Sequence, residues 1–296
     1  MIVDRWPHEF TKQFGHVMPD TYVCFDTEYY YEKEKSIIFE IGHVFVENGE
    51  IDDRLGVVLN WTDHYLVPMR FVKDACQKLA DNMEHPPRAA NIDVMREEGL
   101  NPEKALEFYY KMFTKFKQRG IAFVAHNARR ADVNMLNDNF DGFLEKTFDF
   151  PTKNLWDTGA LIKATKGIDH EIYGGDRWLP KRGESLADYC ARICALPCKG
   201  ILWNLELCLR EAGIDKLVDP SQMHQAETDS YCSHLLFEHL RKQVTKNNEL
   251  SVEGLDDMIQ ELPDGREQLP PYNERIEQRF VQKEMSQWPR IRQARV

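Results

Sequence analysis

The sequence predicts an α/β domain, a mixed β-sheet flanked by helices, from the order of its apolar runs. Three β-rich runs come first, one over residues 21–28 and two on either side of the turn sequence "ENGE" within residues 36–61. A helical pattern, a short apolar strand and further helical patterns follow, and this order is typical of a mixed sheet covered by helices. With 296 residues, the chain is long enough for one large domain with an appendage.

The elements follow from local patterns. Asn48-Gly49 is a two-residue hairpin signal, so the first three strands are expected to be antiparallel. Residues 101–120 predict a helix, because Pro102 suits its first turn, apolar residues recur at helical spacing, and Gly120 ends it. Residues 121–127 predict a short buried strand. Further helices are expected over residues 128–140, 185–196, 202–213 and 225–244.

Changes in composition divide the chain. Residues 1–19 are expected to form an N-terminal extension and residues 20–244 the folded domain, with an insertion at about 163–200. Residues 245–296 are expected to form a C-terminal extension, because they are polar and punctuated by Pro and Gly, as linkers are. One helix is expected within that extension, over residues 273–288, where apolar residues share one side.

The composition limits the classes of function. The net charge of −11 argues against a protein that coats phosphates generically, but an enzyme with a local basic groove remains compatible with it. No apolar window has the length of a membrane span, and the N-terminus lacks a secretory pattern, so an intracellular, cytoplasmic protein without a membrane partner is expected. The seven cysteines are expected to be free thiols. Cys190, Cys194 and Cys198 fall in a helical pattern and indicate core packing rather than a zinc site.

Acidic residues stand at the edges of several predicted elements. Asp26 and Glu28 end the first strand, Asp132 opens a helix after a buried strand, and His224 and Asp229 lie five apart at the start of the last helix. Such carboxylates cannot lie close together and stay ionised without cations, because like charges raise one another's pKa. Two Mg²⁺ or Mn²⁺ ions, about 3.5–4 Å apart, would neutralise them and suit hydrolysis at phosphorus. The histidine suits removal of a proton from the attacking water.

The sequences "FDTE", "HNARRAD" and "HQAETD", in that order, resemble the three motifs of the DEDDh (DnaQ-like) 3′–5′ exonuclease superfamily. The resemblance covers about residues 20–243 and implies an RNase H-like fold, a mixed β-sheet flanked by helices. It implies a site in which four carboxylates bind two metal ions and His224 is the general base. The implied metal ligands are Asp26, Glu28, Asp132 and Asp229.

The sequence departs from the family pattern next to two motifs. Three tyrosines follow Glu28 where the family usually has Thr-Gly, and Arg130-Ala131 precede Asp132 where an aromatic residue is common. These changes keep the metal residues and bear on the choice of substrate.

Candidates for substrate contacts carry an aromatic ring, an amide, an imidazole or a positive charge. The tyrosines could stack on bases or pack at the strand end, and the "HN" pair could organise a loop by hydrogen bonds. The basic residues could hold phosphates or belong to solvated surface. The candidates are Tyr29, Tyr30, His126, Asn127, Arg129, Arg130, Arg177, Trp178, Lys181 and Arg182.

The function expected from the resemblance is a metal-dependent 3′–5′ exonuclease. It would act on the 3′ ends of single-stranded DNA, or on frayed duplex ends, and release 5′-mononucleotides. The alternatives are an RNA 3′–5′ exonuclease of the RNase T or oligoribonuclease type, and a proofreading subunit that contacts a protein partner through residues 245–296. A catalytically inactive nucleic-acid-binding module is the alternative from another class.

Overall fold

The computed structural model describes residues 10, 13–14, 18–32, 35–129, 131–168, 170 and 174–244. Arg130 lies outside the described residues, and so do the linker and helix expected after residue 245. Phe10 and Met18, which belong to the expected N-terminal extension, are buried in the main apolar core. These two side chains are therefore part of the folded domain.

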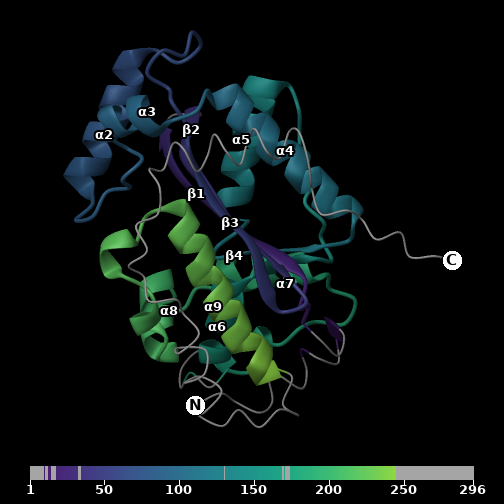
Figure 1. The fold of residues 1–296 in the computed structure, drawn as a ribbon. Helices are drawn as coiled ribbons and strands as arrows, with labels where there is room; N and C mark the ends of the chain where they lie inside the picture. Colours follow the sequence, from purple (N-terminus) through teal and green to yellow (C-terminus); the bar gives the residue numbers. More distant parts are fainter. Residues whose placement is uncertain are drawn as a thin grey trace, which may run out of the picture. The chain divides into compact units, whose positions relative to one another are not determined.

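A mixed five-stranded sheet forms the centre of the domain (Figure 1). Its strand order is β3-β2-β1-β4-β5, with β1 antiparallel to β2, β2 antiparallel to β3, and β4 parallel to both β1 and β5. The strands are β1 (Tyr22–Glu32), β2 (Lys35–Glu47), β3 (Glu50–Val58), β4 (Ala122–Ala125) and β5 (Leu155–Asp157). The three antiparallel strands predicted at the start of the chain are confirmed.

The hairpin between β2 and β3 has the turn chemistry that the sequence indicates. Asn48 and Gly49 have φ angles of 56° and 85°, both in the left-handed region that asparagine and glycine tolerate best. The Asn48 N–H donates to the Thr21 hydroxyl at 3.1 Å, which ties the turn to the start of β1.

Most of the helices form where the periodicity predicts them. The apolar positions of the helix over 102–118 are buried, which accounts for its strong pattern. No helix among the described residues is both long and apolar enough to cross a membrane. The predicted helices are α4 (Pro102–Gln118), α5 (Asp132–Leu144), α7 (Leu186–Ala195), α8 (Leu205–Ala212) and α9 (Ala226–Val244). The others are α2 (Met69–Asn82), α3 (Ile92–Glu98) and α6 (Thr158–Ile168).

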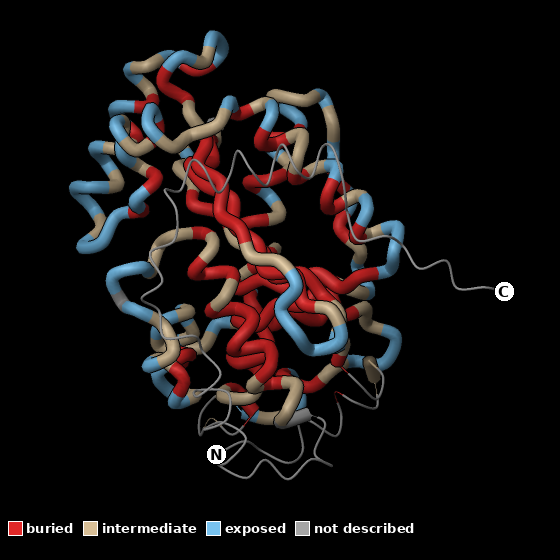
Figure 2. The backbone as a smooth tube through the Cα atoms, in the orientation of Figure 1, coloured by how far each residue is buried: buried red, intermediate tan, exposed pale blue. Residues whose placement is uncertain are grey.

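Helices cover both faces of the sheet. On one face, the ring of Phe25 from β1 contacts Phe113 of α4 at a centroid distance of 5.5 Å. On the other face, Tyr22 and Cys24 of β1 join the core formed with α6 and α9. Figure 2 shows the strands and the inner side of α9 as mostly buried, whereas the α2 and α3 region is mostly exposed.

Between β3 and α4 the chain makes an excursion over residues 60–99, for which the sequence patterns predict no helix. It leaves the end of β3 and returns to the same point, where Leu59 and Leu100 form an isolated parallel bridge. The excursion contains α2 and α3. Helix α2 begins after Pro68 without a side-chain cap, has no acidic residue in its first turn and no basic residue in its last, and buries only Val72 and Ala75, so its ends carry few of the usual helix signals.

Candidate active site

Strand β1 presents Asp26 and Glu28 on one face of the sheet, because alternate side chains of a strand point the same way. This is the face on which Cys24 packs beneath α9. In the ladder with β2, Asp26 is opposite Gly42 and Glu28 is opposite Glu40. Asp26 is partly buried, and Glu28 is buried with 9% exposure.

Helix α5 supplies Asp132 as its first residue. The side chain is 2% exposed, and its Oδ1 accepts hydrogen bonds from the backbone N–H and the hydroxyl of Thr27 at 2.9 and 2.7 Å. Thr27 stands between Asp26 and Glu28 in the chain, so β1 also fixes the carboxylate that α5 contributes.

The segment before α9 supplies His224, and the first turn of the helix supplies Asp229. His224 adopts a left-handed backbone conformation with φ of 61°, and its N–H donates to the Asp229 carboxylate. The Asp229 N–H donates to the Gln225 carbonyl at 2.9 Å, within the first turn of the helix. These bonds explain why the offset of five residues brings both side chains to one place.

The structure brings the five predicted residues together. One ligand atom each from Glu28, His224 and Asp229 lies within 4.8 Å of the others. Burial and then the charges of Asp132, Asp229, Glu28 and Glu40 raise the pKa of Asp26 well above its ordinary value. Since three separate segments of the chain converge here, the cluster depends on the tertiary fold and not on local sequence.

The carboxylates repel one another in a buried setting. Burial, followed by the charges of Asp229, Glu40 and Asp132, raises the pKa of Glu28. Burial also raises the pKa of Asp132 to about 7, against the lowering effect of its hydrogen bonds to Thr27. The pKa of Asp229 is raised to about 7, again mainly by burial. Bound cations would remove this repulsion.

The donor set fits hard divalent cations. Asp229 Oδ1 is buried and has no hydrogen-bond partner among the described residues, and an orphaned carboxylate oxygen is a ligand that such a cation satisfies. Carboxylate oxygens are the ligands that Mg²⁺ and Mn²⁺ prefer. The nitrogen of His224 lies close enough to Glu28 and Asp229 to share a cation with them, so its geometry suits a ligand as well as a base.

Burial and the charge of His85 lower the pKa of His224, and the charge of Glu206 partly opposes this shift. The imidazole is therefore neutral at neutral pH, in the state that can accept a proton. His85 belongs to the excursion over residues 60–99, which brings its charge to the site.

Glu40 is a further carboxylate beside the cluster. It is 5% exposed, and burial raises its pKa to about 8, while a hydrogen bond from the Ala226 N–H has the opposite effect. The sequence did offer a signal, since an acid inside the apolar run "SIIFEIGHVFV" is unusual in a buried strand.

Asp157 organises the loop that follows β4. It ends β5, and its Oδ1 accepts hydrogen bonds from the N–H groups of Asn127 and Ala160, both at 3.0 Å. The carboxylate thus joins the loop after β4 to the start of α6. Burial raises the pKa of Asp157 to about 6.

His126 belongs to the same loop, and both of its ring nitrogens are engaged. Nε2 is 2.8 Å from the Trp203 carbonyl, which can only accept, so Nε2 carries the proton. Nδ1 lies 3.0 Å from the Thr158 hydroxyl. Burial lowers the pKa of His126 to about 4, and its bonds indicate a loop organiser rather than a substrate contact. Asn127, at φ of 66°, has a buried Oδ1 without a hydrogen-bond partner among the described residues.

Three other residues expected to contact substrate, Tyr29, Tyr30 and Arg129, are each partly exposed and partly packed against the protein. Tyr29 and Tyr30 are partly exposed, and the Tyr30 ring meets Phe71 of α2 edge to face at 5.9 Å. Arg129 donates to the Ala187 carbonyl at 3.3 Å and lies 3.6 Å from Asp188, but its side chain is still 39% exposed. It can therefore reach solvent while anchored to the start of α7.

The prediction for Trp178 is wrong. Its side chain is 0% exposed and packs on Gly167, where an added β-carbon would lie 2.3 Å from the indole. A tryptophan that closes the core at the end of α6 cannot stack on a nucleic-acid base. Its basic neighbours Arg177, Lys181 and Arg182 are exposed.

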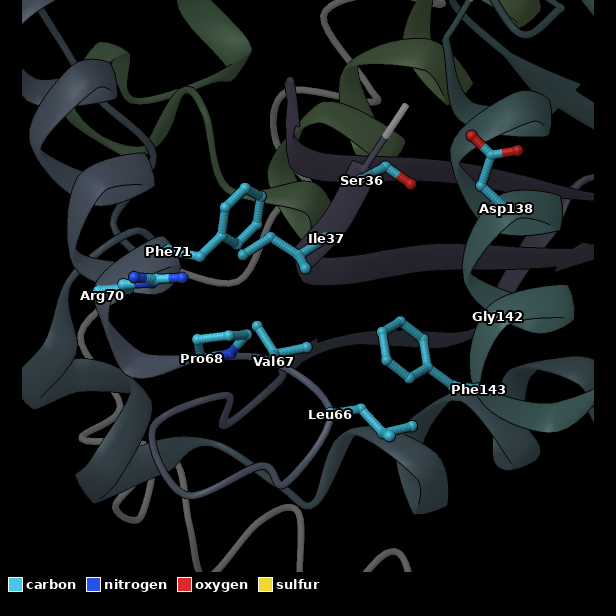
Figure 3. Close-up of a pocket in the computed structure, with 10 residues that line it drawn as sticks. All are labelled: Ser36, Ile37, Leu66, Val67, Pro68, Arg70, Phe71, Asp138, Gly142 and Phe143. Atoms are coloured by element: carbon cyan, nitrogen blue, oxygen red, sulfur yellow. The ribbon is translucent and has the colours of Figure 1, made fainter. Parts of the chain in front are cut away.

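A pocket of about 310 Å³ lies between the start of β2, the segment around Leu66, helix α2 and helix α5 (Figure 3). Its walls include Ile37 of β2. Ile37 is opposite Tyr30 in the ladder, and Tyr30 follows Glu28 by two residues on β1. The rings of Phe71 and Phe143 line it from α2 and α5. Ser36 and Asp138 provide polar groups at one side.

No protein-family model matches the sequence, and no curated protein does. Among solved structures, E. coli exonuclease I in complex with a dT13 oligonucleotide is similar, with a TM-score of 0.50 and 15% identity, over 81% of this chain and 44% of that chain. The domain has the RNase H-like fold of exonuclease I. A second exonuclease I structure agrees, with a TM-score of 0.50 and 15% identity, over 77% of this chain and 43% of that one. This chain therefore spans less than half the length of the exonuclease I chains, and at such identity the similarity shows the fold alone.

Proposed function

We propose that the protein is a metal-dependent 3′–5′ exonuclease that hydrolyses single-stranded DNA, or frayed duplex ends, and releases 5′-mononucleotides. One observation carries this proposal: Glu28, His224 and Asp229 converge within 4.8 Å on the sheet face that also bears Asp26. Asp132, held by Thr27, completes the set. The fold, shared with exonuclease I, supports a nuclease.

The four carboxylates would hold two Mg²⁺ or Mn²⁺ ions. When bound, these ions would supply stabilisation of the charge that develops on the phosphate and on the leaving oxygen. Asp26 and Glu28 come from a rigid central strand, and Asp132 and Asp229 come from the first turns of two helices. Ligands on such elements keep their positions when substrate binds.

His224 would remove a proton from the attacking water. Its lowered pKa keeps the imidazole neutral at neutral pH, so a nitrogen is available to accept that proton. The bond from its own N–H to Asp229 fixes the backbone that carries the ring. The proton acceptor and a metal ligand are thereby joined in one unit.

The end of the strand would lie beside Tyr30 and the neighbouring pocket. The pocket offers the rings of Phe71 and Phe143 to a base, and base–aromatic stacking contributes about 1–3 kcal/mol per base. The dT13 oligonucleotide in the exonuclease I complex is a ligand of that protein. On a shared fold, it supports a single strand as the class of substrate.

The inactive-module alternative predicts the loss of at least one metal carboxylate, and all four are present and close together. The RNA alternative shares the same metal residues and differs in the residues that would contact a 2′-hydroxyl. The proofreading alternative relies on residues after 245, which lie outside the described residues.

A digest of 5′-labelled DNA and RNA single strands of one sequence, with Mg²⁺ or with EDTA, tests the proposal. A ladder that shortens from the 3′ end, needs Mg²⁺ and forms from DNA is the expected result. Asp26→Ala should abolish it, while Asp52→Ala, which removes an exposed acid from β3, should not. No ladder from either strand, or an Asp26→Ala protein that cleaves normally, would contradict the proposed function.

A further inference from the structure

The first turn of α9 rests on a pair of glycines. Gly42 of β2 and Gly56 of β3 are opposite each other in the ladder, and Gly42 is also opposite Asp26 of β1. A β-carbon on Gly42 would lie 2.1 Å from the carbonyl carbon of Ala226, and one on Gly56 would lie 3.0 Å from the β-carbon of Glu227. The helix therefore approaches the strand backbone as closely as glycine permits.

A side chain from the sheet also holds this turn. Glu40, two residues before Gly42 on β2 and therefore on the same face of the sheet, accepts a hydrogen bond from the Ala226 N–H. The first N–H groups of a helix have no partner within the helix and are usually satisfied by a capping side chain just before it. The residue before α9 is Gln225, which is not a preferred cap, so a strand provides the acceptor instead.

Ala226, whose N–H Glu40 binds, lies in the chain between His224 and Asp229, the two residues of this segment that the proposed reaction uses. Ala226 is two residues after His224 and three before Asp229. A second contact also joins the sheet to this turn. Arg54 of β3 forms an ion pair with Glu227 at 2.9 Å, and its guanidinium lies 4.5 Å from the centroid of the Tyr231 ring. The ion pair between Arg54 and Glu227 is partly exposed, whereas the hydrogen bond from Ala226 to Glu40 is buried. Glu40 is thus the inner attachment of the turn, directly opposite Glu28.

We infer that Glu40 is a positioning residue: it holds the start of α9 on the sheet and thereby sets His224 and Asp229 against Glu28. This inference rests on the proposed function. Glu40 contacts no substrate in this scheme, and its role needs only an oxygen that accepts from the Ala226 N–H. Glutamine offers that oxygen at the same place, whereas alanine does not.

The test compares Glu40→Ala with Glu40→Gln in the full chain. Glu40→Ala should lower kcat on single-stranded DNA by about 10–100-fold, the usual effect of losing a residue that orients metal ligands, with little change in KM. It should also weaken Mn²⁺ binding measured by calorimetry. Glu40→Gln should restore both kcat and Mn²⁺ affinity to near the unmodified values.

Glu238→Ala is the matched control, because Glu238 is also a buried carboxylate, 7% exposed, and lies on α9 away from the site. It accepts from Tyr22 at 2.8 Å, so its loss should lower the melting temperature while kcat stays unchanged. Normal kcat and Mn²⁺ affinity in Glu40→Ala would overturn the inference, and so would a Glu40→Gln protein as impaired as Glu40→Ala. If the unmodified protein cleaves neither strand, the proposed function fails, and the Mn²⁺ affinities of the two variants still test the role of Glu40.

Discussion

Thr27 donates two hydrogen bonds to a single oxygen of Asp132, from its N–H at 2.9 Å and from its hydroxyl at 2.7 Å. Both groups are buried, so water cannot replace either bond. The residue between the two acids of the first motif thus orients the acid of the second. An uncharged side chain thereby orients one of the four carboxylates that we propose as metal ligands.

Thr27→Val should keep the shape of the side chain and remove the hydroxyl donor. We expect metal affinity and turnover to fall by about tenfold or more, because ligands lose their orientation when such partners are removed. The unfolding free energy should fall by about 1 kcal/mol. Calorimetry with Mn²⁺ and a single-strand digest measure these effects. Thr27→Ser keeps the hydroxyl, so its Mn²⁺ affinity and turnover should stay near those of the unmodified protein. A fully active Thr27→Val would show that the Thr27 hydroxyl does not orient Asp132.

The stability of the metal-free protein should fall as the pH rises. The pKa values of Asp132 and Asp229 are about 7 in the folded protein, against an ordinary value of 3.8, so the folded state binds more protons in the range between these values. Stability therefore decreases with pH across that window. Melting temperatures in EDTA from pH 4 to 8 should show the decline, and Mn²⁺ should raise the melting temperature more at pH 8 than at pH 5.

Asp132→Asn provides the matched variant for this dependence. Asparagine can still accept from Thr27 through its oxygen, but it carries no charge, so repulsion within the cluster is relieved. In EDTA at pH 8 the variant should melt higher than the unmodified protein, by about 2–4 °C for each kcal/mol gained. It should also be inactive. A lower melting temperature at pH 8 would show that repulsion in the cluster is not what limits stability.

His224 should set the acid limb of the pH–rate profile. Because burial and the charge of His85 lower its pKa, activity should rise at a pH below the ordinary histidine value of 6.5 and then level. His85→Ala should move this limb to higher pH, and Glu206→Gln should move it to lower pH. His224→Ala should lose turnover but still bind a single-stranded oligonucleotide in Ca²⁺. A limb that none of these changes moves would exclude His224 as the base.

The sequence singles out the acids, although not always for the right local reason. Asp132 and Asp229 lie in the first turns of helices, as expected, whereas Asp26 and Glu28, expected to end the first strand, lie within β1, which continues to Glu32. The hairpin at Asn48-Gly49 and the helix over 102–118 have strong local causes, so they are also predicted. Helix α2 has apolar residues at helical spacing but no side-chain cap and only two buried residues, so its ends are not marked in the sequence, and β5, with three residues, is too short to produce a pattern.

Residues that act through tertiary contacts are harder to predict. Glu40 and Thr27 gain their roles from Ala226 and Asp132, which lie far away in the chain. Trp178 stands among basic residues, a composition typical of an exposed loop, but it is buried against Gly167. Composition alone could not reveal that the glycine leaves room for the indole.

The basic loop over residues 177–183 can still contribute to the grip on the strand, although Trp178 is buried. Arg177, Lys181 and Arg182 are exposed, and an acidic protein needs a local positive lining to hold a polyanion. Replacing all three by alanine should raise KM and flatten the salt dependence of binding, by roughly one unit of slope for each phosphate that the variant no longer neutralises. Cleavage of a mononucleotide ester should not change. Fluorescence anisotropy of a labelled single strand, across a salt series with Ca²⁺, measures the slope.

Charge alone could weaken binding, so the control must remove the same charge elsewhere. Lys104, Lys111 and Lys115 are exposed on α4, which covers the sheet face opposite to α9. Their triple alanine variant changes the net charge equally and should leave the slope nearly unchanged. If both triple variants reduce binding alike, the effect is one of net charge. If the loop variant binds with unchanged affinity and slope, the loop does not touch the strand, and Arg129, which lies 3.6 Å from Asp188 and is partly exposed, becomes the residue to test next.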